Sequence, residues 1–115
     1  AECRRNNTPF ALVTLSNGIQ VDPAPQQRDQ LLRRLGAKDL FYPERRLAAF
    51  GKETGIPVLN LAPAMAQQAQ EKGVFFHGFD DRLGRGHWNE SGHQFAGEAI
   101  ASWIGGRPDL TAGRN

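Results

Sequence analysis

The chain has 115 residues, of which 39% are hydrophobic, 9% aromatic and 23% charged. This balance is typical of one soluble globular domain and excludes a disordered or fibrous chain. The net charge of +2 comes from arginine pairs in separate segments, with no basic stripe rich in aromatics, which argues against nucleic-acid binding. No apolar run approaches the roughly 18 to 20 residues of a transmembrane helix. A single cysteine, Cys3, excludes an intrachain disulfide framework and leaves the cellular compartment unknown.

The first half of the chain predicts one strand and two helices. Phe10–Leu15 is a short apolar run that ends in a Ser-Asn-Gly turn, which predicts a buried strand. The proline-punctuated segment Gly18–Pro25 predicts extended backbone. Gln26–Leu35 carries its leucines on one helical face and is followed by a glycine stop. A second helix is expected to open at Pro43 and to end at Gly55.

The second half predicts a further strand and two more helices. Ile56–Leu61 is again a strand of the buried type, and Pro63 opens a helix that ends near Gly73. Val74–Phe76 is interpreted as an edge strand or as an extended approach to the loop that follows. A last helix begins at Glu90 and ends at the Gly105-Gly106 pair. Residues 106–115 are expected to form a frayed tail.

The order of these elements indicates a parallel α/β layer structure. Strands separated by long helical stretches require crossover connections, and these place the strands parallel in one sheet. Phe10–Leu15 and Ile56–Leu61 are apolar on both faces, as central strands of a covered sheet should be. A doubly wound sheet has about five strands, and this chain offers two good ones. We therefore interpret residues 1–115 as a single partial domain.

One segment has the density of a catalytic motif. It places His87 in a glycine-rich loop directly before the last helix, with Asn89 at the N-cap position and Gly92 in the first turn. An imidazole is the side chain best suited to take a proton from a hydroxyl near neutral pH. A loop at the mouth of an α/β sheet is where such a group faces a substrate.

The block His-Trp-Asn-Glu-Ser-Gly-His at residues 87–93 resembles the last conserved block of the SGNH (GDSL-type) hydrolases. In that family a histidine is followed two residues on by Asn and five on by Gly, before the C-terminal helix. Residues 18–21, 39–47, 55–59 and 77–79 are similar to upstream stretches of the family and come in the right order. The resemblance implies a flavodoxin-like three-layer α/β/α sandwich of which only the C-terminal part is present, with His87 as the catalytic base.

The activity that this resemblance implies is hydrolysis of an ester through an acyl-serine intermediate, or acyl transfer from one. His87 would deprotonate the serine and then protonate the leaving alcohol. The alternatives are part of a polysaccharide O-acyltransferase on the same fold, and a non-catalytic binding or dimerisation module. The substrate, an ester or an acylated carbohydrate, and the residues that bind it are not encoded in any readable motif.

The chain also departs from the family pattern. The family usually has an Asp three residues before the histidine, and here that position is Gly84. Asp80 and Asp81 lie nearby and are read as solvated loop residues, so a backbone carbonyl could orient the His87 ring instead. The Gly-Asp-Ser block and the two oxyanion blocks are not recognisable. Because Ser16 reads as a turn residue, we expect this chain alone to be inactive.

The remaining candidates favour structural roles. His77 and His93 accompany His87, but no HExxH motif is present, and His87 and His93, six residues apart, do not share a helical face. We therefore predict no metal and no cofactor. His77 is interpreted as a structural loop residue and His93 as a packing residue.

The expected partners follow from the missing strands. An open sheet edge presents unpaired backbone groups beside apolar side chains, and such an edge should be covered. We predict that another chain binds along this edge, either the N-terminal half of the same enzyme or a second copy of this chain.

Overall fold

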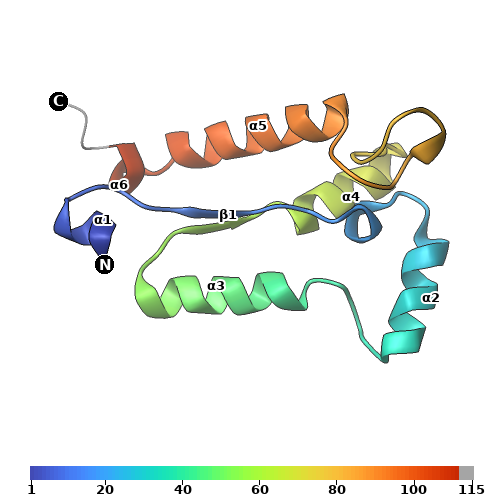
Figure 1. Cartoon of the computed structure of the whole chain (residues 1–115), viewed down its shortest axis with the longest axis horizontal. Helices are drawn as coiled ribbons and strands as arrows, with labels where there is room; N and C mark the ends of the chain where they lie inside the picture. The colour runs from blue at the N-terminus through green and yellow to red at the C-terminus, as the bar shows by residue number, and fades with distance from the viewer. Residues whose placement is uncertain (112–115) are drawn as a thin grey trace.

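The computed structural model describes residues 1–111. The chain is largely α-helical, with a small two-stranded parallel sheet (Figure 1). The helices, in chain order, are α1 (Glu2–Arg5), α2 (Pro25–Leu35), α3 (Tyr42–Thr54), α4 (Ala62–Lys72), α5 (Glu90–Gly105) and α6 (Pro108–Thr111). The strands are β1 (Leu12–Thr14) and β2 (Val58–Asn60), and the 3₁₀ turns are η1 (Gly18–Val21) and η2 (Asp80–Arg82). Within these residues no helix is long and apolar enough to cross a bilayer.

The predicted strands and helices are present, with shorter strands than expected. β1 and β2 pair in parallel with Val13 opposite Leu59, and the crossover between them contains α2 and α3. The helices α2, α3 and α4 each end at a glycine in the left-handed conformation, as the sequence indicates. Asn89 caps α5, since its side-chain oxygen accepts from the Gly92 N–H at 3.1 Å.

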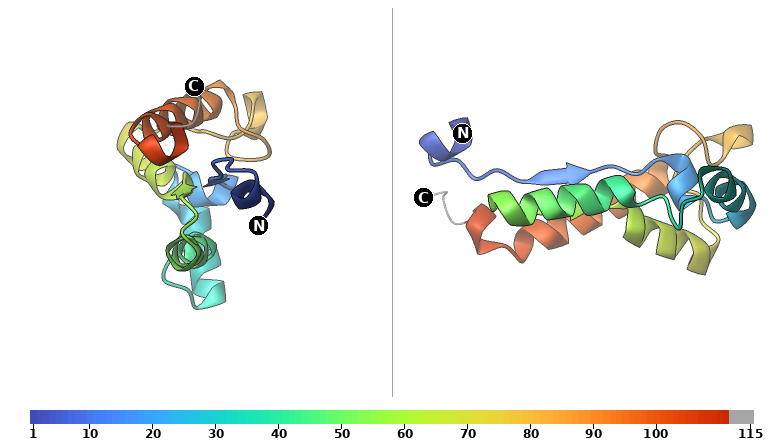
Figure 2. Two further views of the ribbon diagram at one scale, coloured as in Figure 1. Left: turned by 90° about the vertical axis from the view of Figure 1, so that its left-hand side faces the viewer. Right: turned by 90° about the horizontal axis from the view of Figure 1, so that it is seen from below.

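The two strands lie between helices from distant parts of the sequence. Figures 1 and 2 show α5 on one side of the strand pair and α3 on the opposite side. The buried apolar core lies between α4, the first turns of α5 and η1, and its centre is formed by Leu61, Met65 and Val21. Val13 and Leu59 pack against this cluster from the sheet. The sheet thus meets the core mainly at one end of the molecule.

Two sequence-based expectations about the first strand region are wrong. All three residues of β1 and of β2 are half-buried rather than buried, because no third strand flanks either of them within residues 1–111. The segment expected to be extended starts with the 3₁₀ turn η1. This turn has a local cause. Asn17 and Gln20 form a capping box in which the Gln20 side chain accepts from the Asn17 N–H at 2.8 Å.

The structure also shows the conformation of Val74–Phe76 and of the first part of the expected tail. Val74–Phe76 is extended rather than a strand, and the residue after it, His77, forms an isolated antiparallel bridge with Trp88. Within the expected frayed tail, Pro108–Thr111 form α6, whose Arg107 neighbour pairs with Asp109 at 2.8 Å. The remaining tail residues, 112–115, lie outside the described part of the chain.

The outer edges of both strands are open. Leu12 donates its N–H to Pro57, and Thr14 accepts from Leu61, so these residues of β1 turn their backbone toward β2. In a parallel pair the alternate residues face away, which places the Val13 and Val58 backbone groups on the two outer edges. Between residues 1 and 111 no further strand covers either edge.

The dimensions of the chain are large for its length. The radius of gyration is 16.3 Å, whereas a compact domain of this size has about 13 Å. The accessible surface is 8185 Å², against about 6,200 Å² for a compact folded protein of this mass. Large apolar side chains such as Phe10, Leu15 and Phe50 are exposed. The chain therefore exposes more surface to solvent than a compact protein of the same mass.

Candidate functional site

The candidate site is the loop of residues 77–89, which connects the extended segment after α4 to α5. The two ends of this loop are held together by Asn89. Its side-chain amide donates to the Phe75 carbonyl at 2.8 Å and to the Gly78 carbonyl at 3.1 Å, and its backbone N–H donates to the Phe76 carbonyl at 3.0 Å. One asparagine thus caps α5 and also closes the neck of the loop.

Gly92 allows α5 to start close against this neck. A Cβ atom at Gly92 would lie 2.3 Å from the Phe76 carbonyl oxygen and 2.9 Å from the Trp88 Cβ, so any side chain here would push the helix away. The Asn and Gly of the His-x-Asn-x-x-Gly block therefore both have a structural explanation.

Trp88 ties the loop to the end of β1. Its indole N–H donates to the Ser16 Oγ at 2.8 Å, two residues beyond the last residue of β1. His93, exposed on the first turns of α5, packs edge-on against the Trp88 ring with centroids 5.6 Å apart. The loop consequently sits at the carboxyl end of β1, which is the edge where parallel α/β sheets place their ligand sites.

His77 makes the second link between the loop and β1. Its side chain is buried, with 4% exposed, and Nε2 lies 2.9 Å from the Ser16 Oγ. The other ring nitrogen, Nδ1, lies 2.7 Å from the Gly86 carbonyl oxygen. Because a carbonyl can only accept, Nδ1 carries a hydrogen. In that tautomer of the imidazole, Nε2 is the acceptor for the Ser16 hydroxyl.

His87 differs from Trp88, Asn89 and Gly92 of the same block. Its side chain is exposed, and among residues 1–111 the ring takes part in no hydrogen bond or ion pair. Its backbone is held, since the His87 carbonyl accepts from the Gly78 N–H at 3.0 Å. The sequence suggests that a backbone carbonyl could orient the His87 ring. In the structure the ring that contacts a backbone carbonyl is that of His77, through Gly86.

The two nearby aspartates do not take the place of the missing acid in this structure. Asp80 and Asp81 lie on η2 with exposed side chains, and within the described residues neither forms an ion pair with a histidine. Gly84, at the position of the family's Asp, donates its N–H to the His77 carbonyl at 2.8 Å and closes the inner part of the loop.

A polar cavity of about 470 Å³ lies against the loop at the end of β1. The cavity is lined by Ser16, His77 and Gly86, which form the hydrogen-bonded link between β1 and the loop. The rest of its wall comes from Asn17, Gly18, Ile19, Asp22, Gln27, Gly84 and Arg85. The wall offers hydroxyl, amide, carboxylate and guanidinium groups in a small space. Such a wall suits a polar, hydrogen-bonding ligand better than an acyl chain.

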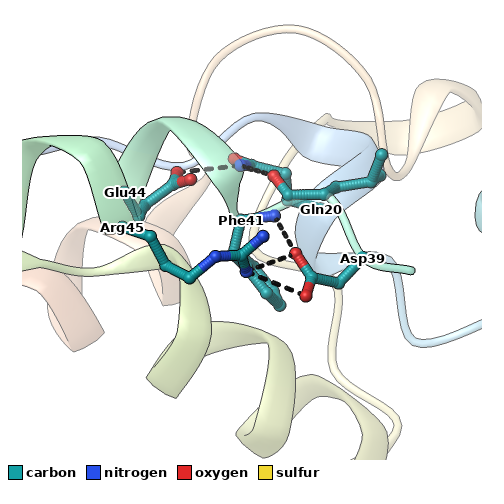
Figure 3. Close-up of polar contacts among 6 residues, drawn as sticks. Gln20, Asp39, Phe41, Glu44 and Arg45 are labelled. Atoms are coloured by element: carbon teal, nitrogen blue, oxygen red, sulfur yellow. Dashed lines mark hydrogen bonds and ion pairs between the residues drawn. The ribbon is translucent and has the colours of Figure 1, made fainter. Parts of the chain in front are cut away.

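A polar network anchors η1, and with it the end of β1, to α3 (Figure 3). The Gln20 amide donates to the Leu40 carbonyl at 2.9 Å and to the buried Glu44 carboxylate at 2.8 Å. Close by, the Arg45 guanidinium binds both carboxylate oxygens of Asp39 at 2.7 and 2.8 Å. This contact, with the Phe41 N–H, lowers the pKa of Asp39 below its ordinary value.

The structure brings together a pair that sequence reasoning did not join. Ser16 and His77 are 61 positions apart, and both were assigned structural roles separately. The sequence offers one signal for this contact. Ser16 directly follows a predicted strand, and His77 follows the apolar segment Val74–Phe76, so both lie where an apolar extended segment ends.

In the part of the chain that the structure describes, no three His, Cys, Asp or Glu side chains gather as metal ligands would. Comparison of the chain with protein-family models, with curated proteins and with solved structures gives no match.

Proposed function

We propose that this chain is the C-terminal portion of an SGNH-like serine ester hydrolase and contributes the catalytic base, His87. One observation carries the proposal. Trp88, Asn89 and Gly92 each hold the loop or the helix in place, whereas the His87 ring is exposed and unengaged among residues 1–111. A histidine that the fold positions without using it for packing is available for chemistry.

In the proposed reaction the nucleophilic serine comes from outside this chain. The neutral His87 ring takes the serine hydroxyl proton as the oxygen attacks the acyl carbonyl, and it then gives that proton to the leaving alcohol. Water, or a second alcohol in a transferase, repeats the sequence to release the acyl group. The polar wall of the cavity beside the loop, which His77 lines and His87 does not, supports a hydroxyl-rich acyl donor, such as an acylated carbohydrate, over a lipid.

The remaining architecture is part of the same proposal. α5 and α3 on opposite sides of the strand pair are consistent with a three-layer sandwich that further strands would complete (Figure 2). The open edges of β1 and β2 and about 2,000 Å² of surface beyond that of a compact protein support a partner that covers them. That partner is the N-terminal half of the same enzyme or a second copy of this chain.

Two measurements on the isolated chain test these proposals. We expect hydrolysis of p-nitrophenyl acetate no faster than by free imidazole, and no fluorophosphonate adduct at Ser16, because the nucleophile is supplied elsewhere. Light scattering after size-exclusion chromatography should show a complex rather than a monomer at micromolar concentration. An adduct on Ser16 would make the chain its own nucleophile, and a stable, cooperatively unfolding monomer would argue against the partner.

The same surface favours a second candidate, a non-catalytic binding or dimerisation module, because open strand edges recruit other chains whatever the site does. The sequence encoded upstream of Ala1 separates the two. A Gly-Asp-Ser block there supports the hydrolase, and an unrelated domain supports the module.

A further inference from the structure

Two peptide planes meet at the His87 Cα atom, and each is held by one hydrogen bond. The plane between Gly86 and His87 is held through the Gly86 carbonyl, which accepts from the His77 ring at 2.7 Å. The plane between His87 and Trp88 is held through the His87 carbonyl, which accepts from the Gly78 N–H at 3.0 Å. Because peptide units are planar, these two bonds together fix the direction in which the His87 Cβ leaves the backbone.

The first of these planes depends on a side chain. Gly86 has a φ of +79°, and a Cβ atom there would meet nothing within 4 Å, so packing does not restrain this residue. The His77 ring is the group that holds its carbonyl, and the ring is itself held by the Ser16 hydroxyl at 2.9 Å. The His77 ring therefore joins Ser16, at the end of β1, to the peptide bond of His87, and its burial also holds it in place.

We infer that His77 is a positioning residue for His87, an inference that rests on the proposed function because it assigns His77 a role only through that base. The pair Ser16 and His77 has the spacing of a nucleophile and its base. However, the Ser16 oxygen already accepts the Trp88 indole N–H, and the His77 ring is almost fully buried. These contacts suit a fixed link between strand and loop.

A pair of substitutions separates the two ring nitrogens. In His77→Asn the amide nitrogen branches from Cγ, as Nδ1 does, so the donor to the Gly86 carbonyl is kept and the link to Ser16 is lost. In His77→Gln the terminal amide lies one bond further out, near the place of Nε2, and its oxygen can accept from the Ser16 hydroxyl. The link to Ser16 is therefore kept and the donor to Gly86 is lost. Ser16→Ala is the matched control, since it leaves the Nδ1 donor in place.

The measurement is the ¹⁵N order parameter of two neighbouring amides in the isolated chain. The His87 N–H belongs to the plane held by His77, and the Trp88 N–H belongs to the plane held by Gly78. In the wild type, in His77→Asn and in Ser16→Ala, both should be rigid, near 0.85. In His77→Gln the His87 amide should fall below about 0.6 while the Trp88 amide stays rigid.

A purely structural His77 would not produce this pattern. It would lower the melting temperature of both variants and loosen both amides together, or leave both unchanged, and either result would overturn the inference. A fluorophosphonate adduct on Ser16 would also overturn it, because the pair would then be a nucleophile and its base. The relaxation measurement needs no catalysis, so its failure is distinct from a failure of the proposed function.

Discussion

The two ends of this molecule are built differently. At the carboxyl ends of the strands, α4, η1, the 77–89 loop and the start of α5 enclose the buried apolar residues, and side-chain hydrogen bonds from Asn89, Trp88 and His77 fasten the loop. At the opposite end, α1, the last turns of α3 and α5, and α6 carry no buried apolar residue among those described. The end that holds the candidate site is thus the better packed of the two, and the other end leaves apolar side chains such as Phe10 and Phe50 exposed.

The largest stability effect should come from the core of the site end. Met65 on α4 is fully buried, so Met65→Ala should lower the free energy of unfolding by about 2 to 5 kcal/mol, as measured by urea denaturation. Phe50→Ala at the exposed end of α3 is the matched truncation and should change it by less than about 0.5 kcal/mol. Equal losses would show that the two ends are equally well packed.

An intermediate effect is expected at the neck of the loop. Asn89→Ala removes the cap of α5 and the donors to the Phe75 and Gly78 carbonyls, which together should cost about 1 to 3 kcal/mol. Asn89→Ser restores a capping oxygen but cannot reach both carbonyls, so it should recover about 1 kcal/mol in the same denaturation experiment. Full recovery by serine would mean that the two carbonyl bonds contribute nothing.

The smallest effect should come from the exposed ion pair of Asp39 and Arg45. The Arg45 contact lowers the folded-state pKa of Asp39, so its contribution to stability is present above the unfolded pKa near 4 and is lost as the pH falls through the lower folded value. Asp39→Asn should therefore lower the urea midpoint slightly at pH 7, and the difference from wild type should shrink toward pH 3. A difference that grows as the pH falls would contradict this sign.

Local signals in the sequence predicted most of the elements, and long-range ones were missed. The helices α3 and α4 follow from their opening prolines and terminal glycines, and α2 follows from its leucine face and terminal glycine. These signals all lie within or next to the helix that they predict. The turn η1 was missed because the reciprocal bonds of Asn17 and Gln20 outweighed the extended pattern of the prolines that follow. The strands were found, but their half-burial depends on which neighbours they have, and that is not a property of the strands themselves.

The candidate site divides in the same way. The loop position of His87 and the capping role of Asn89 could be read from a seven-residue block, because the spacing of the block reflects local geometry. The contacts of His77 with Ser16 and Gly86 could not, since they depend on how the loop folds back onto β1. Trp88, to which the block assigns no role, is the donor that completes this link.

Turnover by the assembled enzyme decides whether His87 is the general base. In the enzyme assembled with its serine-bearing portion, His87→Ala should lower kcat for a synthetic ester by several orders of magnitude with unchanged thermal stability, because the side chain is exposed on a loop. His93→Gln, an exposed histidine of the same block, should retain nearly normal turnover. Near-normal kcat in His87→Ala would contradict the assignment.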